Sequence, residues 1–514
     1  MTAIAKAGLR WLVGMALVSV LGACSSLPAL EGQRSASQPI DTSGTRLARA
    51  IAPRAAAHPG LSGVLPLANA LDAFAARVLL ARSAERTLDV QYYLWNQDTS
   101  GLLLMGALRE AADRGVRVRL LLDDMNTAGM DDLLAALHAH QNIEVRLFNP
   151  FAVRWPRAVG YLTDFRRLNR RMHNKSFTAD GQATIVGGRN VGDEYFGATD
   201  GAAFVDLDVL AVGQVVPAVS ADFERYWASG SSYPLHLLVR APPPNGPAPV
   251  SDPPGSAAAA YLDAVRTSPF VSDLLQGRLA LDWAPVRLVS DDPAKALGQG
   301  TATTLVEQLN RVIGNPARRL QLVSAYFVPG AAGTEALVAM SRRGVDVGVL
   351  TNSLAATDVP VVHAGYARRR KPLLEGGVKL YELRRQPRVI ETPDGPSTPV
   401  LRASSASLHA KTFTVDGLHV FIGSFNFDPR SMHLNTEMGL VIASPALARQ
   451  AEAAFGQAIQ GRAYTVRLDE EGGLYWLDPV PGGQAVRHAT EPGTSTWQRA
   501  AVRFLSLLPI EWLL

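Results

Sequence analysis

HNKSFTADG at residues 173–181 and HAKTFTVDG at residues 409–417 are two copies of one pattern, and this repetition decides the fold of the chain. Both copies fit His-x-Lys-x-x-x-x-Asp, and a glycine and an asparagine follow at the same distances in each. A motif this short is weak evidence when it stands alone. Two copies that also share the residues after them indicate an internal duplication. We therefore expect two similar lobes that each contribute one motif.

The residue types in the motif suit chemistry at a phosphodiester. The candidate residues are His173, Lys175 and Asn190 in the first copy and His409, Lys411 and Asn426 in the second. A phosphodiester is an anion with a poor leaving group, so its cleavage needs cations around the phosphate, a nucleophile and an acid on the opposite side. Alternate residues of a strand point to one face, so each histidine is expected to project together with its lysine. If the lobes pack face to face, all six side chains surround one phosphate.

A histidine that attacks phosphorus and then moves a proton needs a partner on its other ring nitrogen. The segments DLDVLAV at 206–212 and NTEMGLV at 435–441 follow the two motifs. When they are aligned on their apolar strands, Asp208 corresponds to Glu437. These two carboxylates are therefore predicted to orient the histidines. The alternative is that each caps a neighbouring loop at the end of a strand.

Composition places the chain among folded proteins with more than one core. A length of 514 residues is too great for one ordinary core and suggests two domains of about 200 residues. A hydrophobic content of 47% and a charged content of 19% are typical of globular proteins. The net charge of +4 favours anionic partners but does not distinguish nucleic acid from acidic lipid. The single cysteine excludes an internal disulfide.

The amino terminus has the pattern of an export signal. Lys6 and Arg10 precede an apolar run over residues 11–20, and Leu-Gly-Ala-Cys24 follows. The run is too short to span a bilayer and has the length of a signal-peptide core. Its end resembles a bacterial lipobox, which implies lipidation of Cys24, export and a membrane anchor, with Ser25 favouring the outer membrane. An ordinary signal peptide with an unmodified cysteine is the alternative.

Changes in composition along the chain predict six segments. They are a signal peptide (1–23), a tether (24–66), a first lobe (67–235), a Pro-rich linker (236–258), a second lobe (259–485) and an amphipathic carboxyl-terminal segment (486–514). Strand patterns alternate with helical patterns in both lobes, beginning at 88–94 and 320–326. This alternation predicts an α/β fold with a mostly parallel sheet that helices cover on both faces.

The paired motifs, each with its downstream glycine and asparagine, resemble those of the phospholipase D superfamily over residues 67–479. Within it, the chain is similar to bacterial cardiolipin synthases, especially the type designated C, at residues 89–93, 187–195, 423–431 and 505–514. The resemblance implies a duplicated α-β-α sandwich whose two pseudo-symmetric lobes share one active site. Many such synthases have an amino-terminal pair of transmembrane segments, for which this chain has only the lipobox-like segment.

The resemblance also implies a reaction that passes through a phosphohistidine. His173 is predicted to be the nucleophile and His409 the acid and base, although the symmetry allows the reverse. Lysines and asparagines would bind the phosphate, so no metal or other cofactor is expected. The remaining catalytic-motif residues, Asp180 and Asp416, are expected away from the phosphate in a supporting role, because a carboxylate beside a bound phosphate would be repelled.

The resemblance implies that a phosphatidyl group is transferred between lipids, with phosphatidylglycerol and phosphatidylethanolamine giving cardiolipin and ethanolamine. Three alternatives remain: a phospholipase D that uses water as the acceptor, an exported nuclease, and an inactive binding scaffold. The acyl anchor disfavours nucleic acid as a partner. The scaffold is disfavoured because neither copy of the motif has lost its histidine or lysine.

Two further patterns predict contact with a membrane surface. Apolar residues at helical steps in 497–514 are typical of a helix that lies in the headgroup layer, and the alternative is a terminal helix docked on the core. A first basic run at 166–171 and a second basic run at 368–371 are candidates for holding anionic headgroups, although such runs are often only solvated faces.

Overall fold

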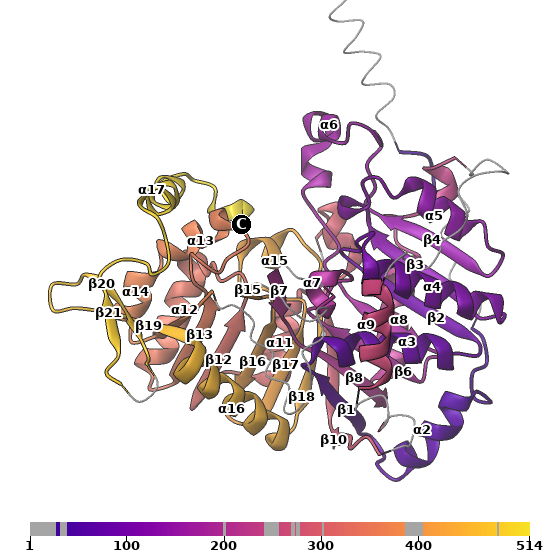
Figure 1. Ribbon diagram of the computed structural model, residues 1–514, viewed down its shortest axis with the longest axis horizontal. Coiled ribbons are helices and arrows are strands. Elements are labelled where there is room, and N and C mark those ends of the chain that lie inside the picture. Colours follow the sequence, from indigo (N-terminus) through magenta and orange to yellow (C-terminus); the bar gives the residue numbers. More distant parts are fainter. Residues whose placement is uncertain are drawn as a thin grey trace, which may run out of the picture.

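The computed structural model describes residues 27–30, 39–198, 202–240, 256–268, 273, 278–300, 303–385, 405–480 and 483–514. These residues form two α/β lobes that lie side by side, one from each half of the chain (Figure 1). The expected signal peptide and Cys24 lie outside the described residues, as do residues 241–255 of the expected linker.

Each lobe is built on one large sheet of described strands. The first sheet has the spatial order β10 (Asp282–Ala284), β1 (Ser62–Leu67), β8 (Asp208–Gly213), β6 (Ala183–Gly187), β5 (Ser176–Ala179), β2 (Thr87–Tyr92), β3 (Arg117–Asp123), β4 (Ile143–Phe148) and β9 (Ser232–Pro234). The second has the order β11 (Val286–Ser290), β18 (Met438–Ala443), β17 (His419–Gly423), β16 (Lys411–Val415), β12 (Arg319–Ser324), β13 (Asp346–Asn352), β14 (Lys379–Leu383), β19 (Ala463–Leu468), β20 (Leu474–Asp478) and β21 (Val486–His488). The run from β1 to β9 has the same arrangement as the run from β11 to β19, so the predicted duplication is confirmed.

Helices cover both faces of the two sheets. The described α-helices are α2 (Arg46–Ala56), α3 (Ala70–Ser83), α4 (Thr99–Asp113), α5 (Asp131–His138), α6 (Ala158–Leu168), α7 (Asp193–Phe196), α8 (Val216–Trp227), α9 (Ser256–Arg266), α11 (Leu305–Ile313), α12 (Gly330–Arg342), α13 (Pro360–Ala367), α14 (Arg370–Glu375), α15 (Pro429–His433), α16 (Pro445–Arg462) and α17 (Thr496–Leu505), with a final 3₁₀ turn η5 (Glu511–Leu513). In the first lobe, α3 and α4 pack on one face of the sheet and α8 on the other. In the second lobe, α12 and α14 take one face and α16 the other.

The sheets are mixed, and the prediction of mostly parallel sheets is wrong. Among the described strands of these two sheets, only the central strands β2, β3 and β4, and their counterparts β12, β13 and β14, pair in parallel. The motif strands β5 and β16 pair in antiparallel fashion on both sides. The reason is local, because tight turns that begin at Asp180 and Asp416 join each motif strand to the next strand, and so short a connection permits only an antiparallel pair.

The lobe boundaries differ from those expected from composition. The expected tether contains α2 and most of β1, which lies between β8 and β10 in the first sheet. The expected second lobe begins at residue 259, yet Tyr261 and Val265 of α9 lie in the core of the first lobe. The chain passes from the first sheet to the second at Pro285, between β10 and β11. Proline-rich composition marks chain that cannot form a central strand, and here it does not mark the lobe boundary.

An apolar core shared by both sheets joins the lobes. The first lobe contributes Val64, Val186 and Val209 from β1, β6 and β8, and the second contributes Ile422 and Leu440 from β17 and β18. Each fully buried aliphatic side chain of this kind contributes roughly 1.5–3 kcal/mol. In addition, β7 (Ala202–Val205) of the first lobe pairs in parallel with β15 (Ser405–Leu408) of the second. The relative position of the lobes is therefore determined by the fold itself.

The motif aspartates fix the turns at the ends of their strands. Asp180 and Asp416 have positive φ angles of 50° and 55°. The Asp180 carboxylate accepts hydrogen bonds from the backbone N–H groups of residues 85–87, and Asp416 accepts from those of residues 317–319, at 2.7 to 3.0 Å. Both lie at the far end of the motif strand from its histidine. Their observed contacts are with the backbone, which is a structural role.

We expect Asp180→Ala to lower the free energy of unfolding by about 3 kcal/mol, because three backbone donors lose their hydrogen-bond acceptor. Asp180 is fully buried, whereas Asp416 is partly exposed, so water can replace more of the lost bonds at Asp416. Urea denaturation of both alanine variants measures the two effects. Equal losses of stability, or none for Asp180→Ala, would contradict this account.

Candidate active site

Each motif histidine is placed by a strand-like contact with the opposite lobe. In the pairing of β15 with β7, Leu408 lies opposite Val205, so the next residues, His409 and Asp206, lie side by side. His409 Nδ1 is 2.6 Å from Asp206 Oδ2. The backbone N–H of His409 also donates to the carbonyl of Val205 at 2.8 Å. The second motif histidine is therefore oriented by a carboxylate of the first lobe.

The same arrangement recurs around the first histidine. Met172 forms a parallel bridge with Thr436, and the His173 N–H donates to the Thr436 carbonyl at 2.9 Å. His173 Nδ1 is 2.8 Å from Glu437 Oε2. The lobes thus exchange carboxylates, since each provides the one that holds the other's histidine.

Glu437 lies where an orienting partner is expected, but Asp208 does not, and Asp206 occupies its place. Asp208 is buried and pairs with Arg77 at 2.8 Å and Arg189 at 3.3 Å. The sequence alignment was displaced by two residues. Sheet register shows this, because Asp208 lies opposite Gly187 whereas Gly439, two residues after Glu437, lies opposite the equivalent Gly423. One feature of the sequence could have pointed to Asp206: it follows directly after a short strand, just as His409 does.

The lysines and asparagines gather around the two imidazoles. Lys175 Nζ donates to the carbonyl of His173 at 2.6 Å, and Lys411 Nζ lies 2.8 Å from His409 Nδ1. Both lysines are buried. The buried amides of Asn190 and Asn426 each have an Oδ1 without a hydrogen-bond partner in the described part of the chain. The site therefore holds two buried lysines and retains unused polar groups. Burial lowers the pKa of Lys175 well below its ordinary value, Glu437 opposes this, and Lys411 adds to it.

Electrostatics differ between the two histidines. Burial lowers the pKa of His173 well below its ordinary value, and Lys175 and Lys411 lower it further, so this imidazole is neutral at neutral pH. Burial also raises the pKa of Glu437 to about 7, so the partner of His173 is only partly ionised near neutrality. A neutral imidazole with a free Nε2 is the form that can attack phosphorus.

At the second histidine the partner carboxylate stays ionised. Burial alone would raise the pKa of Asp206, but His409, Lys411 and Arg189 hold it below its ordinary value. Burial and Lys411 lower the pKa of His409, and Asp206 opposes them. Burial lowers the pKa of Lys411 to about 8. A fixed anion at Nδ1 is what stabilises an imidazolium when the ring takes up a proton.

Tyrosines line the two imidazoles. The Tyr93 ring stands edge-on to His173 with centroids 5.0 Å apart, and Tyr195 stands edge-on to His409 at 5.1 Å. Tyr326 contacts the His409 ring at 6.4 Å, with the ring planes nearly perpendicular. The His173 and His409 side chains are only 9% and 6% exposed, so both imidazoles are largely shielded from water.

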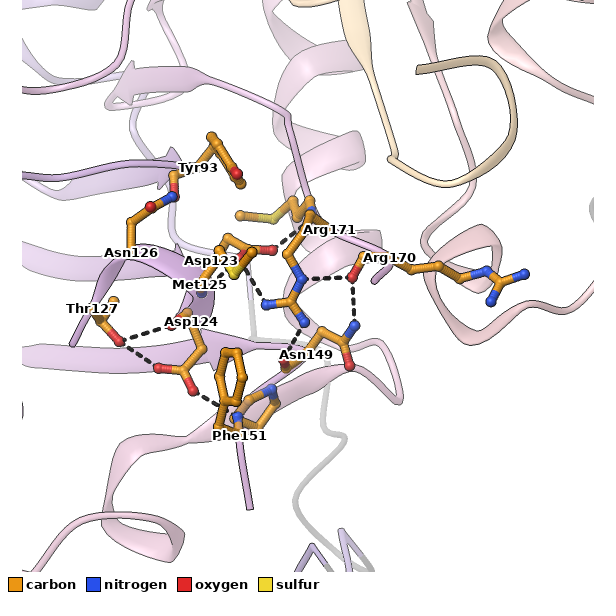
Figure 2. Close-up of polar contacts among 12 residues, drawn as sticks. Tyr93, Asp123, Asp124, Met125, Asn126, Thr127, Asn149, Phe151, Arg170 and Arg171 are labelled. Atoms are coloured by element: carbon orange, nitrogen blue, oxygen red, sulfur yellow. Dashed lines mark hydrogen bonds and ion pairs between the residues drawn. The ribbon is translucent and has the colours of Figure 1, made fainter. Parts of the chain in front are cut away.

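A buried ion pair holds the chain just before His173. The Asp123 carboxylate, at the end of β3, accepts from the backbone N–H of Met172 at 2.7 Å and from Arg171 at 3.0 Å. Figure 2 shows the Arg171 guanidinium between Asp123 and Asn149, and it donates to the Asn149 carbonyl at 2.9 Å. Asp123 and Arg171 are both fully buried. The residue before the nucleophile is thus fixed to the sheet.

The second lobe has an uncharged version of the same device. Asn352 ends β13 as Asp123 ends β3, and its Oδ1 accepts from the backbone N–H of Leu408 at 2.9 Å. Its Nδ2 donates to the carbonyl of Leu408 at 2.8 Å. Each motif histidine therefore follows a residue that a strand-end side chain holds. Sequence reasoning missed both residues, because the contact joins positions far apart in the chain.

Two arginines of the second basic run are held in ion pairs. Arg370 is buried and pairs with Glu382 at 2.9 Å and Glu491 at 2.7 Å, and Arg369 pairs with Glu511 at 2.6 Å. These ion pairs attach the carboxyl-terminal segment to the second lobe. These two arginines are therefore not available to anionic headgroups. Arg368 is exposed and has no carboxylate partner among the described residues, and Lys371 is exposed beside Glu375, so the binding of headgroups by this run stays a prediction.

The first basic run is divided between two roles. Arg171 belongs to the buried ion pair, and Arg167 pairs with Asp164. Arg166 and Arg170 have no carboxylate partner in the described part of the chain, so they remain available to an anion. Among the described residues, no group of three or more His, Cys, Asp or Glu side chains is placed to hold a metal ion.

Two pseudo-symmetric lobes that bring two such motifs to one site define a phospholipase D-type enzyme. The family model described as "Cardiolipin synthase, PLD-like domain" matches residues 79–227 and 309–459, one match in each lobe. The chain belongs to this family, and it is a phosphatidyltransferase of the phospholipase D type.

Relatives and solved structures agree with this assignment. The chain is 52% identical over 474 residues to cardiolipin synthase C of Escherichia coli (strain K12), which covers 91% of this chain and 100% of that protein. It is 30% identical over 459 residues to an uncharacterized protein of Helicobacter pylori (strain ATCC 700392 / 26695), covering 88% of this chain and 89% of that one. The crystal structure of phosphatidylserine synthase from Haemophilus influenzae Rd KW20 shares the fold with a TM-score of 0.57 at 15% identity, over 90% of this chain and 99% of that chain.

We expect Asn352→Ala to lower kcat by about tenfold or more, because His409 loses the bonds that fix the preceding residue and small misplacements of reacting groups are costly. The thermal midpoint should fall by only a few degrees. Steady-state kinetics at saturating substrate, with the folded fraction measured by circular dichroism, tests this. Asn352→Asp retains the acceptor for Leu408 N–H and should recover part of the rate. An unchanged kcat in Asn352→Ala would show that the contact does not position the histidine.

Proposed function

We propose that this enzyme makes cardiolipin by moving a phosphatidyl group from phosphatidylethanolamine to phosphatidylglycerol through a phosphohistidine at His173. The proposal rests on one observation: each lobe provides the carboxylate that binds the motif histidine of the other lobe. It gives one neutral imidazole and, beside it, one imidazole held by an ionised carboxylate. A two-step transfer requires such a pair, in which one ring attacks and the other carries the proton.

In the first step His173 Nε2 attacks phosphorus and the bond to the ethanolamine oxygen breaks. The fraction of His409 that carries a proton, stabilised by the ionised Asp206, gives this proton to that oxygen. In the second step neutral His409 takes the proton from a glycerol hydroxyl of phosphatidylglycerol, and that oxygen displaces His173. Lys175 and Lys411 balance the charge of the phosphate oxygens throughout. Every atom and proton is accounted for, and both histidines return to their starting states.

The choice of lipid over water as the acceptor rests on two supports. The enzyme is 52% identical to a protein called cardiolipin synthase C over nearly all of both chains. The histidine side chains are also more than nine-tenths buried, which favours an acceptor that enters with its own apolar chains and displaces water. A phospholipase D that releases phosphatidic acid remains the alternative.

Contact with a membrane surface is supported by apolar side chains that two elements expose. Around α6, Trp155 is 87% and Leu162 86% exposed. In the carboxyl-terminal segment, Trp497 is 84% and Leu507 77% exposed. On the opposite side of α17, Val502 is buried against the second lobe, so this helix docks on the core and still presents an apolar face outward. No helix among the described residues is long and apolar enough to cross a bilayer.

These two elements belong to one side of the enzyme. Both α6 and α17 stand at the upper edge in Figure 1. Arg430 connects them, because it donates to Asn169 at the end of α6 at 2.7 Å and to the carbonyl of Leu513 in η5 at 3.2 Å. The exposed Arg166 and Arg503 lie on the same elements and suit anionic headgroups. We further propose export and anchoring through a lipid on Cys24, with the outer membrane favoured.

A substrate with a good leaving group separates the roles of the two histidines. Phosphatidyl-p-nitrophenol needs no acid for its first step, so we expect His409→Ala to retain a burst of p-nitrophenol and His173→Ala to lose it. With labelled phosphatidylglycerol and phosphatidylethanolamine, both variants should lose cardiolipin formation by at least about a thousandfold. His433→Ala, which changes an exposed histidine outside the motifs, is the control. If the wild type makes phosphatidic acid as its sole product, the hydrolase is favoured. A burst of p-nitrophenol from His173→Ala would show that His173 is not the nucleophile.

Replacing Trp155 and Leu162 together by serine should weaken binding to vesicles by about tenfold or more, because two large apolar side chains no longer enter the headgroup layer. Co-sedimentation with vesicles of phosphatidylglycerol and phosphatidylethanolamine measures the loss. Leu418→Ser is the control, since Leu418 is 41% exposed in the turn between β16 and β17, away from the histidine end of the motif strand. Equal binding of the two variants would place the docking surface elsewhere.

A further inference from the structure

The two sides of the active site are not equivalent beyond the motifs. Trp95 and Phe327 occupy matching positions after β2 and β12, because each forms a parallel bridge to the segment just after its motif asparagine. The preceding residues, Leu94 and Tyr326, therefore correspond. The first lobe has an aliphatic side chain where the second has a phenol.

A second difference lies in the loops that lead to α5 and α13. These loops, residues 124–130 and 353–359, have the same length and connect equivalent strands to equivalent helices. Asp358 in the second loop therefore corresponds to Gly129 in the first. A carboxylate is thus present on the side of His409 and absent from the matching position on the side of His173.

These two extra groups contact each other beside His409. The Tyr326 hydroxyl donates to Asp358 Oδ2 at 2.7 Å, and the Tyr326 ring contacts His409. Tyr195 lies on the same imidazole. Asp358 is exposed, and it forms no ion pair with any described residue. It is also close enough to the site to oppose the lowering of the Lys411 pKa by burial.

The other side of the site differs in its unpaired charge. Arg430 lies near Tyr93, the ring that contacts His173, whereas Arg171 on that side is buried and paired with Asp123. Among the described residues, the Arg430 guanidinium hydrogen-bonds to oxygen atoms of Asn169 and Leu513 and forms no ion pair. The two sides therefore differ, with Arg430 near Tyr93 and His173 and Asp358 near Tyr326 and His409. An enzyme that bound the same headgroup in both half-reactions would not need different charged groups beside its two histidines.

We propose that Tyr195, Tyr326 and Asp358 form a binding site for the ammonium group of an amine headgroup. The inference rests on the proposed function, in which His409 protonates the departing oxygen. In ethanolamine the nitrogen is two carbons from that oxygen, so it must lie within a few ångströms of the His409 ring. There it meets the faces or edges of two tyrosines and a carboxylate oriented by a hydrogen bond, which together bind ammonium groups.

The subsite gives the enzyme a means to distinguish its two lipids. Phosphatidylglycerol has a neutral headgroup with no cation for Asp358, so it gains nothing on this side of the site. Phosphatidylethanolamine is then held with its leaving group toward His409 and its phosphorus toward His173. Asp358 and Tyr326 are specificity-determining residues in this scheme.

Binding to a catalytically inactive enzyme tests the subsite without relying on the reaction. We use the His173→Ala variant and measure calorimetric affinities for glycerophosphoethanolamine and glycerophosphoglycerol. The ethanolamine compound should bind about tenfold more tightly, and adding Asp358→Asn should remove this preference while leaving the affinity for the glycerol compound unchanged. Adding Tyr326→Phe should reduce the preference in part. Asp132→Asn, which changes an exposed aspartate on α5 of the other lobe, should preserve it.

Kinetics provide the second readout. In the active enzyme Asp358→Asn should raise the KM for phosphatidylethanolamine about tenfold, with little change in kcat and none in the KM for phosphatidylglycerol. With phosphatidyl-p-nitrophenol, which lacks an amine, kcat/KM should fall much less than it does with phosphatidylethanolamine. No preference in the inactive enzyme, or a preference that survives Asp358→Asn, overturns the subsite even if cardiolipin is made. Absence of cardiolipin from the wild type, by contrast, overturns the proposed function and is seen in a separate assay.

Discussion

The active site depends on two hydrogen bonds between the lobes, in each of which a carboxylate of one lobe binds the motif histidine of the other. His173 of the first lobe is held by Glu437 of the second, and His409 of the second by Asp206 of the first. Neither lobe alone contains a complete histidine–carboxylate pair, so the active site exists only when both are folded and docked. The shared apolar core and the pairing of β7 with β15 bring these partners together. Burial at this boundary also produces the shifted pKa values on which the proposed chemistry relies.

Duplication provides a symmetric frame, and small departures from symmetry give the two halves different tasks. A glutamate whose pKa is raised to about 7 accompanies His173, whereas an ionised aspartate accompanies His409. An ion pair fixes the residue before the first histidine, and a neutral asparagine fixes the residue before the second. These differences suit a nucleophile on one side and a proton carrier on the other. In the proposed reaction they would also let the two sides receive different lipids.

Surface features are consistent with a substrate that resides in a bilayer. The exposed apolar residues of α6 and of the carboxyl-terminal segment lie on elements that Arg430 connects. Two arginines of the second basic run, Arg369 and Arg370, secure that carboxyl-terminal segment through Glu511 and Glu491. Some arginines of the two basic runs thus form internal ion pairs, whereas others, such as Arg166, remain available to a ligand.

The duplication, the family and the residues of the two motifs could be predicted from sequence alone. The reason is that the motif is short, has fixed spacing and occurs twice in the chain. Most strands and helices near the motifs also followed from local periodicity. Tertiary structure decided what depends on contacts between distant residues: that Asp206 and not Asp208 reaches a histidine, that Asp123 and Asn352 hold the motifs, and that α9 and β10 belong to the first lobe. The physical reason is that strand register and lobe docking select partners through packing and backbone hydrogen bonds summed over whole elements. A shift of two residues leaves the local sequence pattern almost unchanged, yet it moves a carboxylate from one partner to another.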